Sequence, residues 1–137
     1  AHGALLFIDL DDFKAINDHY GHLVGDDYLR KIAQIIERTF DNREMTAGRY
    51  GGEEFGFVMP NSDIESAATL AEKIRCTIEN EKITHVGSSR GIVTVSLGVA
   101  AMRPHAGANP ELIIAAADAA LYLAKQNGKN RIELAGK

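Results

Sequence analysis

The feature that decides this fold is a glycine pair followed by two carboxylates, in the stretch Arg49-Tyr50-Gly51-Gly52-Glu53-Glu54-Phe55. Adjacent glycines between apolar segments indicate a β-hairpin turn, because both residues reach positive φ without a steric penalty. The flanking segments, residues 46–50 and 55–59, are therefore predicted to be paired strands, and Pro60 ends the second one. The hairpin presents Glu53 and Glu54 at its turn, where neighbouring carboxylates can hold a metal ion.

A second acidic cluster, Asp9-Leu10-Asp11-Asp12, closes a continuous apolar run over residues 4–8. Such a run predicts a central strand buried on both faces, with Asp9 at its carboxyl end. In the folded sheet this end can lie beside the hairpin turn, which would bring Asp9 near Glu53. Oxygen ligands without an accompanying cysteine or histidine favour magnesium or manganese over zinc.

Composition limits the classes of protein to which the chain can belong. A length of 137 residues with 45% hydrophobic content fits one globular domain with its own core. The formal net charge of -4 argues against a sequence-independent nucleic-acid binder, which needs a basic face. The single cysteine, Cys76, excludes an internal disulfide and is assigned a packing role. No apolar run approaches the roughly 20 residues that span a bilayer.

Three helices are predicted from apolar residues that recur three and four positions apart. The first covers about residues 26–40, and the second covers residues 64–78 after a cap at Ser62 or Asp63. The third has Asn109 as its cap, Pro110 in its first turn and Asn127-Gly128 at its end. Strict alternation predicts a strand over residues 93–99, and residues 82–86 and 131–134 are predicted as shorter strands. The resulting order predicts an α/β (α+β) sandwich with a mixed central sheet covered by helices.

The separated motifs resemble, in order and spacing, the GGDEF domain family, whose active members are diguanylate cyclases that join two GTP molecules into cyclic di-GMP. The resemblance covers nearly the whole chain, through the segments 7–14, 16–18, 20–22, 25–26, 49–55, 96–100, 117–118 and 122–128. It implies a ferredoxin-like palm similar to that of nucleotidyl cyclases, which agrees with the element order. It also implies one GGDEF domain over residues 1–137, without the family's opening helix and Leu-Thr-Gly-Leu turn.

Carried over position by position, the resemblance implies a site for two Mg²⁺ or Mn²⁺ ions. Asp9, Glu53 and the backbone carbonyl of Leu10 would be the metal ligands. Glu53 and Glu54 would be the catalytic carboxylates, with Glu54 as a supporting acid or base. The structural alternatives are a turn cap for Asp9 and an exposed hairpin acid for Glu53.

The resemblance assigns guanine recognition to Asn17 and Asp26. A carboxylate at Asp26 can accept from the ring N–H and the exocyclic amine of guanine, whereas adenine presents no such pair of donors. This residue therefore favours GTP over ATP. Helix capping and turn formation are the structural alternatives for both residues.

Further positions match family residues that contact the rest of the nucleotide: His22, Lys14, Lys125, Lys129 and the phosphate-loop glycines Gly51 and Gly52. The lysines would neutralise phosphates, and their structural alternative is a solvated helix surface. Lys129 stands where many members have arginine, so it keeps the charge but lacks the bidentate fork.

The implied reaction is a nucleotidyl transfer in which the 3′-hydroxyl of one GTP attacks the α-phosphate of another and pyrophosphate leaves. Metal ions would offset the repulsion between triphosphate and acidic side chains. Each domain would hold one GTP, so a symmetric product would require a homodimer. Two other classes stay open, namely a catalytically silent GTP-binding sensor module and an RNA-binding ferredoxin-like domain, which the acidic charge disfavours.

The resemblance also implies a setting in bacterial cyclic di-GMP signalling. We expect a cytoplasmic domain that contacts neither nucleic acid nor membrane, with regulatory domains upstream in a parent protein that could be tethered to a membrane. The family's inhibitory product site uses an Arg-x-x-Asp motif, but this chain has Asn42-Arg43-Glu44-Met45 there. We therefore expect no feedback inhibition through that site.

Overall fold

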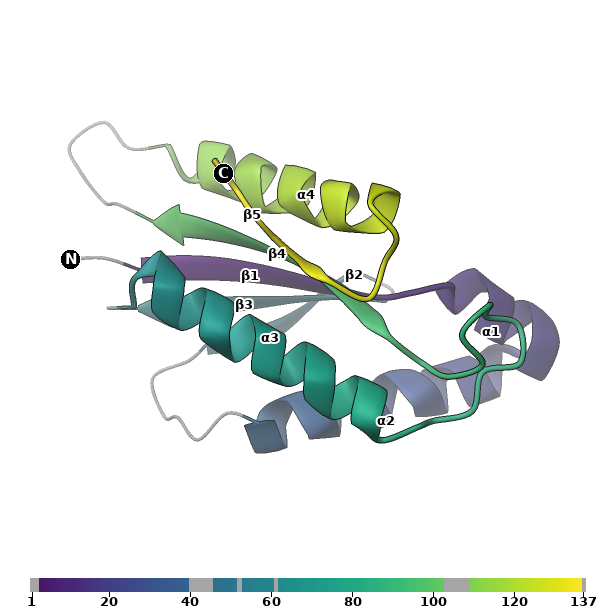
Figure 1. Ribbon diagram of the computed structural model, residues 1–137. Coiled ribbons are helices and arrows are strands. Elements are labelled where there is room, and N and C mark those ends of the chain that lie inside the picture. Colours follow the sequence, from purple (N-terminus) through teal and green to yellow (C-terminus); the bar gives the residue numbers. More distant parts are fainter. Residues whose placement is uncertain (1–2, 40–45, 52, 61, 103–108, 137) are drawn as a thin grey trace.

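The computed structural model describes residues 3–39, 46–51, 53–60, 62–102 and 109–136. Its elements are, in chain order, β1 (Gly3–Leu10), α1 (Phe13–Tyr20), α2 (His22–Thr39), β2 (Thr46–Gly51), β3 (Glu54–Pro60), α3 (Ile64–Asn80), β4 (Val95–Met102), α4 (Pro110–Gln126) and β5 (Ile132–Leu134). Five strands form one sheet in the order β2-β3-β1-β4-β5 (Figure 1). The β4–β5 pair is parallel and the other pairs are antiparallel. This mixed sheet, with the ferredoxin-like order of its first four strands, confirms the predicted fold class.

Two local predictions were wrong. The polar stretch after Asp12 forms a separate helix, α1, and α2 begins at His22, four residues before the expected start. Residues 82–86 form no strand and contribute only an isolated bridge from Thr84 to Ile92. Lys82 has φ 54, which interrupts the extended backbone that a strand requires.

The alternating side chains of β1 divide the core between the two faces of the sheet. Figure 1 shows α4 on one side of the sheet and α2 and α3 on the other. Leu6 and Ile8 belong to the larger cluster beneath α2 and α3, and Leu5 and Phe7 belong to the smaller cluster beneath α4. Asp9 is the next residue in the second series, so its side chain lies on the α4 face.

Helix α4 begins and ends as predicted. The Asn109 side chain accepts a hydrogen bond from the Glu111 amide at 2.9 Å, and the Asn127 amide donates to the Leu123 carbonyl at 2.8 Å. None of the helices in the described residues is long and apolar enough to cross a membrane.

Close packing of α4 on β4 depends on Gly98. A Cβ atom there would lie 2.3 Å from the Ala117 carbonyl oxygen and 2.4 Å from the Leu121 amide nitrogen, so only glycine fits beneath the helix backbone. Leu121 is one helical turn before Lys125. The contact at Gly98 therefore fixes how deeply the lysine of this helix reaches toward the end of β1.

We expect Gly98→Ala to lower the free energy of unfolding by about 2 kcal/mol, because the methyl group must displace the backbone of α4. Urea denaturation followed by circular dichroism measures the change. Ala119→Ser, on the exposed side of α4, is the control and should cost only about 0.5 kcal/mol. A Gly98→Ala variant as stable as the wild type would contradict the close approach.

Candidate active site

The structure brings Asp9 together with the carboxylates of the hairpin. Asp9 is directly opposite Glu54 of β3 and Ser96 of β4 in the two strand registers. Residues directly opposite each other in antiparallel strands share a face, so Asp9 and Glu54 both point toward the α4 side. Glu53 lies in the turn immediately before β3 and is half-buried.

Burial and mutual repulsion disfavour the negative charge of this group. Burial raises the pKa of Asp9 from its ordinary 3.8 to about 6; Glu53 and Glu54 add to the shift, and Lys125 opposes it. Burial also raises the pKa of Glu54, with Asp118 of α4 and Glu53 adding further negative charge nearby. The negative charges of Asp9, Glu53 and Glu54 therefore repel one another, and a cation bound among them would favour their charged forms.

Lys125 of α4 supplies the positive charge that the structure places here. Its Nζ lies 3.3 Å from Asp9 Oδ2 and 3.6 Å from Asp11 Oδ1. The other carboxylate oxygen of Asp9, Oδ1, is buried and has no hydrogen-bond partner among the residues that the structure describes. A buried carboxylate oxygen without a donor is a natural ligand for a hard cation.

The donor set fits Mg²⁺ or Mn²⁺, which require oxygen ligands. Within the part of the chain that the structure describes, no three histidine, cysteine or acidic side chains gather into a group that could hold a metal. The ligand set implied by the family resemblance contains only two carboxylates, Asp9 and Glu53, and takes its third donor from the backbone carbonyl of Leu10. Leu10 is the last residue of β1 and is paired with Val95.

Asp11 has a role that sequence reasoning missed. Its buried carboxylate accepts hydrogen bonds from Thr94 Oγ1 at 2.7 Å, Ser96 Oγ at 2.6 Å and the Asn130 amide at 3.0 Å. Asp12, the last residue of the acidic cluster, is paired with Lys129 at 2.5 Å. The acidic cluster is thus divided, because Asp11 and Asp12 are engaged within the fold and Asp9 keeps one oxygen free.

The proposed guanine readers meet at the junction of α1 and α2. Asn17 of α1 packs against Gly25 of α2, where a Cβ atom would lie 1.9 Å from Asn17 Oδ1. This Oδ1 atom is buried, and none of the described residues forms a hydrogen bond with it. Asp26 and His22 are exposed on α2 beside it. The junction therefore offers an unused buried acceptor next to an accessible carboxylate.

The other residues predicted to belong to the site are Lys14 and the glycine pair. Lys14 is exposed and pairs with Asp18 at 2.9 Å on the surface of α1. Gly51 is the last residue of β2 and pairs with Glu54. Gly52 and the altered inhibitory-site segment 42–45 lie outside the described residues.

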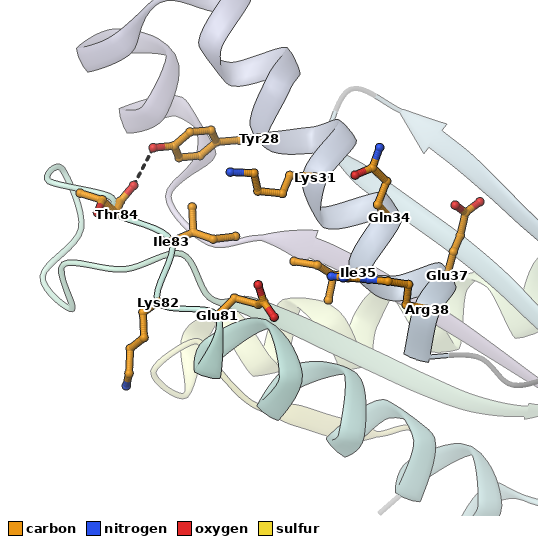
Figure 2. A pocket seen from close by; sticks show the side chains of 10 residues that line it. All are labelled: Tyr28, Lys31, Gln34, Ile35, Glu37, Arg38, Glu81, Lys82, Ile83 and Thr84. Atoms are coloured by element: carbon orange, nitrogen blue, oxygen red, sulfur yellow. Dashed lines mark hydrogen bonds between the residues drawn. The ribbon is translucent and has the colours of Figure 1, made fainter.

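A groove of about 950 Å³ lies away from this site, between α2 and residues 81–84 (Figure 2). Ile35 and Ile83 contribute its apolar surface, and the Tyr28 hydroxyl donates to the Thr84 carbonyl at 2.7 Å. Ile35 belongs to the cluster beneath α2 and α3, whereas Asp9 faces α4. None of the predicted site residues that the structure describes lines this groove, so the acidic site at the end of β1 remains the candidate for chemistry.

Comparison with known proteins identifies a matching family. Residues 1–131 match the family described as diguanylate cyclase, GGDEF domain. Diguanylate cyclase A of Treponema denticola is 42% identical over 131 residues, which cover 96% of this chain and 34% of that protein. The chain spans about a third of the length of the curated relatives it matches.

Solved structures of GGDEF domains have the same fold as this chain. The GGDEF domain of DgcB from Caulobacter crescentus, in complex with c-di-GMP, is similar with a TM-score of 0.88 and 35% identity, over 99% of this chain and 79% of that one. The active GGEEF domain of a diguanylate cyclase from Vibrio cholerae has a TM-score of 0.87 and 32% identity, over 99% and 84% of the two chains.

The raised pKa of Asp9 predicts a pH-dependent stability in the presence of a chelator. Because its folded-state pKa of about 6 exceeds the ordinary 3.8, the folded protein binds the proton more tightly, and stability falls as pH rises through this window. We expect Asp9→Asn to be roughly 2 kcal/mol more stable than the wild type at pH 7.5 and similar to it at pH 4. Urea denaturation in EDTA measures this difference. A constant difference between pH 4 and 7.5 would show that Asp9 is not the destabilising group.

Proposed function

This chain belongs to the GGDEF domain family, and from that premise we propose that it is a diguanylate cyclase that condenses two GTP molecules into cyclic di-GMP and pyrophosphate. The observation that carries the proposal is the half-buried carboxylate of Asp9, whose Oδ1 atom is buried without a hydrogen-bond partner among the described residues. Asp9 lies directly across from the hairpin with the sequence Gly51-Gly52-Glu53-Glu54-Phe55. A domain that used this hairpin only as a turn would have no need to bury Asp9 without a full set of donors.

Asp9, Glu53 and the Leu10 carbonyl would hold the divalent ions. When bound, these ions supply positive charge at the triphosphate and lower the pKa of the attacking 3′-hydroxyl. The support for this assignment is chemical, because the donors are hard oxygens and Asp9 Oδ1 has no hydrogen-bond partner within the described residues. Their number, two for each site, follows the family resemblance.

The lysines orient the triphosphate and neutralise its charge. In the nucleotide-free fold Lys125 neutralises Asp9 and Asp11, and Lys129 neutralises Asp12. We propose that both ammonium groups bind phosphate oxygens when a nucleotide enters, so that each lysine exchanges a carboxylate for a phosphate. Lys14 would make a further contact from α1, because its side chain is exposed and is restrained only by a surface pair with Asp18.

Glu54 is suited to a supporting role in proton transfer. Its pKa is raised by burial and by neighbouring carboxylates, which makes it a better proton acceptor near neutral pH. We propose that Glu53 acts at the reacting 3′-hydroxyl. Glu54 would help to accept the proton that this hydroxyl loses as it attacks the α-phosphate. The glycine pair Gly51 and Gly52 would allow the backbone to approach the phosphates closely.

Guanine selection is assigned to Asn17 and Asp26. Asp26 accepts from the ring N–H and exocyclic amine of guanine, and the free Asn17 Oδ1 accepts a further donor of the bound nucleotide. His22, which is exposed at the start of α2, contacts the substrate beside them.

One domain would hold one GTP, so we propose that two domains face each other about a two-fold axis when the product closes. Control of this pairing would lie in other parts of a longer parent protein, as the greater length of the curated relatives suggests. We place the domain in the cytoplasm, where GTP is supplied.

An assay with GTP and Mg²⁺, with cyclic di-GMP detected by mass spectrometry, tests the proposal. Glu53→Gln should reduce product formation at least about 100-fold, because it removes a carboxylate that acts at the reacting groups. The control, Glu65→Gln, makes the same chemical change on the exposed surface of α3 and should leave turnover unchanged. GTP binding by the wild type without turnover at high protein concentration would favour the silent sensor module. Absence of GTP binding would refute both.

Gly25→Ala tests the guanine assignment separately. The new methyl group would collide with Asn17 Oδ1, the far end of a side chain that can move, so stability should change by less than about 1 kcal/mol. Displacement of this acceptor should weaken binding of a non-hydrolysable GTP analogue about tenfold. Isothermal titration calorimetry measures the effect, with Val24→Ala as the neighbouring control. Unchanged affinity in Gly25→Ala would exclude Asn17 from base recognition.

A further inference from the structure

The turn between α4 and β5 holds Lys129 in an unfavourable backbone conformation. Lys129 and Asn130 have φ values of 65 and 47, in the left-handed region that asparagine tolerates better than lysine. The Lys129 amide donates to the Ala124 carbonyl at 2.9 Å, and its Nζ contacts Asp12 Oδ1 at 2.5 Å. A residue persists in such a conformation only when its surroundings hold it there.

Asn130 supplies this restraint. Its Oδ1 accepts from Arg75 Nη1 at 3.0 Å, its Nδ2 donates to Glu79 Oε2 at 2.9 Å, and its amide donates to Asp11 Oδ2 at 3.0 Å. These bonds join the turn to α3 on one side and to the end of β1 on the other. The Asp11 carboxylate that anchors Asn130 is also the one that contacts Lys125.

Arg75 is itself held rigidly on α3. Only 15% of the Arg75 side chain is exposed. Its guanidinium group donates hydrogen bonds to Glu72 at 2.9 and 2.6 Å and to Glu79 at 3.0 Å. The hydrogen bond from Asn130 is the largest cause that lowers the pKa of Glu79, with Arg75 contributing. The planar fork of arginine can contact Glu72, Glu79 and Asn130 at once, which a lysine could not do.

We propose that Arg75 and Glu79 of α3 are positioning residues that hold the Asn130 side chain and, through it, the turn that directs Lys129 toward the phosphates of the nucleotide. This inference rests on the proposed function of Lys129 as a phosphate-binding residue. Arg75 and Glu79 would act through Lys129 and would not contact the nucleotide themselves. Because Lys129 binds phosphate and takes no part in the bond-forming step, their loss should change the affinity for GTP and leave kcat nearly unchanged.

Steady-state kinetics with GTP and direct binding of a non-hydrolysable GTP analogue test the proposal. Arg75→Met should raise KM and weaken analogue binding about tenfold, with kcat changed less than about twofold. The control is Lys73→Met, which removes a positive charge from the exposed surface of α3 and leaves the bonds of Arg75 intact, and it should leave KM within about twofold. A loss of kcat without a change in KM would overturn the positioning role.

A double-mutant cycle separates positioning from a general loss of stability. If Arg75 acts through Lys129, Arg75→Met should weaken analogue binding by less than about twofold when it is added to Lys129→Ala. The same tenfold loss in both backgrounds would refute the proposal. Asn130→Gly serves as a second variant in case Arg75→Met fails to fold. It removes the Asn130 side chain but permits the left-handed backbone, and it should weaken analogue binding about tenfold, as expected for Arg75→Met.

Amide hydrogen exchange in the nucleotide-free protein gives a result that does not depend on GTP binding. Arg75→Met should speed exchange at the Asn130 amide about tenfold, whereas Lys73→Met should not. If the wild type bound no GTP analogue, the proposed function would fail, and this exchange measurement would still decide whether α3 restrains the turn. Unchanged exchange at Asn130 would overturn the restraint itself.

Discussion

The structure depends on how negative charge is accommodated at the buried end of β1. Burying a carboxylate is costly unless donors or a cation compensate it. Asp11 is compensated within the fold by two hydroxyl groups and a backbone amide. Asp9 contacts the ammonium of Lys125, and its other oxygen is buried without a hydrogen-bond partner in the described part of the chain. The difference between these two aspartates is the reason that we assign the proposed cation site to Asp9 and a structural role to Asp11.

Helix α4 links this electrostatic requirement to packing. Because Gly98 lets the helix backbone lie directly on β4, Lys125 reaches the end of β1, and the turn that follows brings Lys129 to Asp12. That turn is bonded in its own right to α3 and to Asp11 through Asn130. Lys125 and Lys129 are thus positioned by separate contacts. Each is paired with aspartate, and in the proposed mechanism a nucleotide phosphate takes the place of that aspartate.

Sequence patterns predicted the elements whose signals are local. The hairpin around the glycine pair, the buried strand β1 and the capped ends of α4 follow from composition and spacing over a few residues. Helix α1 was not predicted because its few apolar residues lie within a polar stretch. The strand predicted for residues 82–86 does not form, since Lys82 has a left-handed backbone conformation. The partners of Asp11 and Asn130 could not be predicted, because each depends on contacts between segments that only the tertiary fold brings together.

The central claim, that the half-buried carboxylate of Asp9 is stabilised by a cation, can be tested directly by ¹³C NMR titration of its side chain. With a chelator present, we expect a pKa of about 6, because burial outweighs the effect of Lys125. Addition of Mg²⁺ with a non-hydrolysable GTP analogue should lower that pKa below its ordinary value, since a bound cation favours the charged form. An ordinary pKa under both conditions would contradict the account.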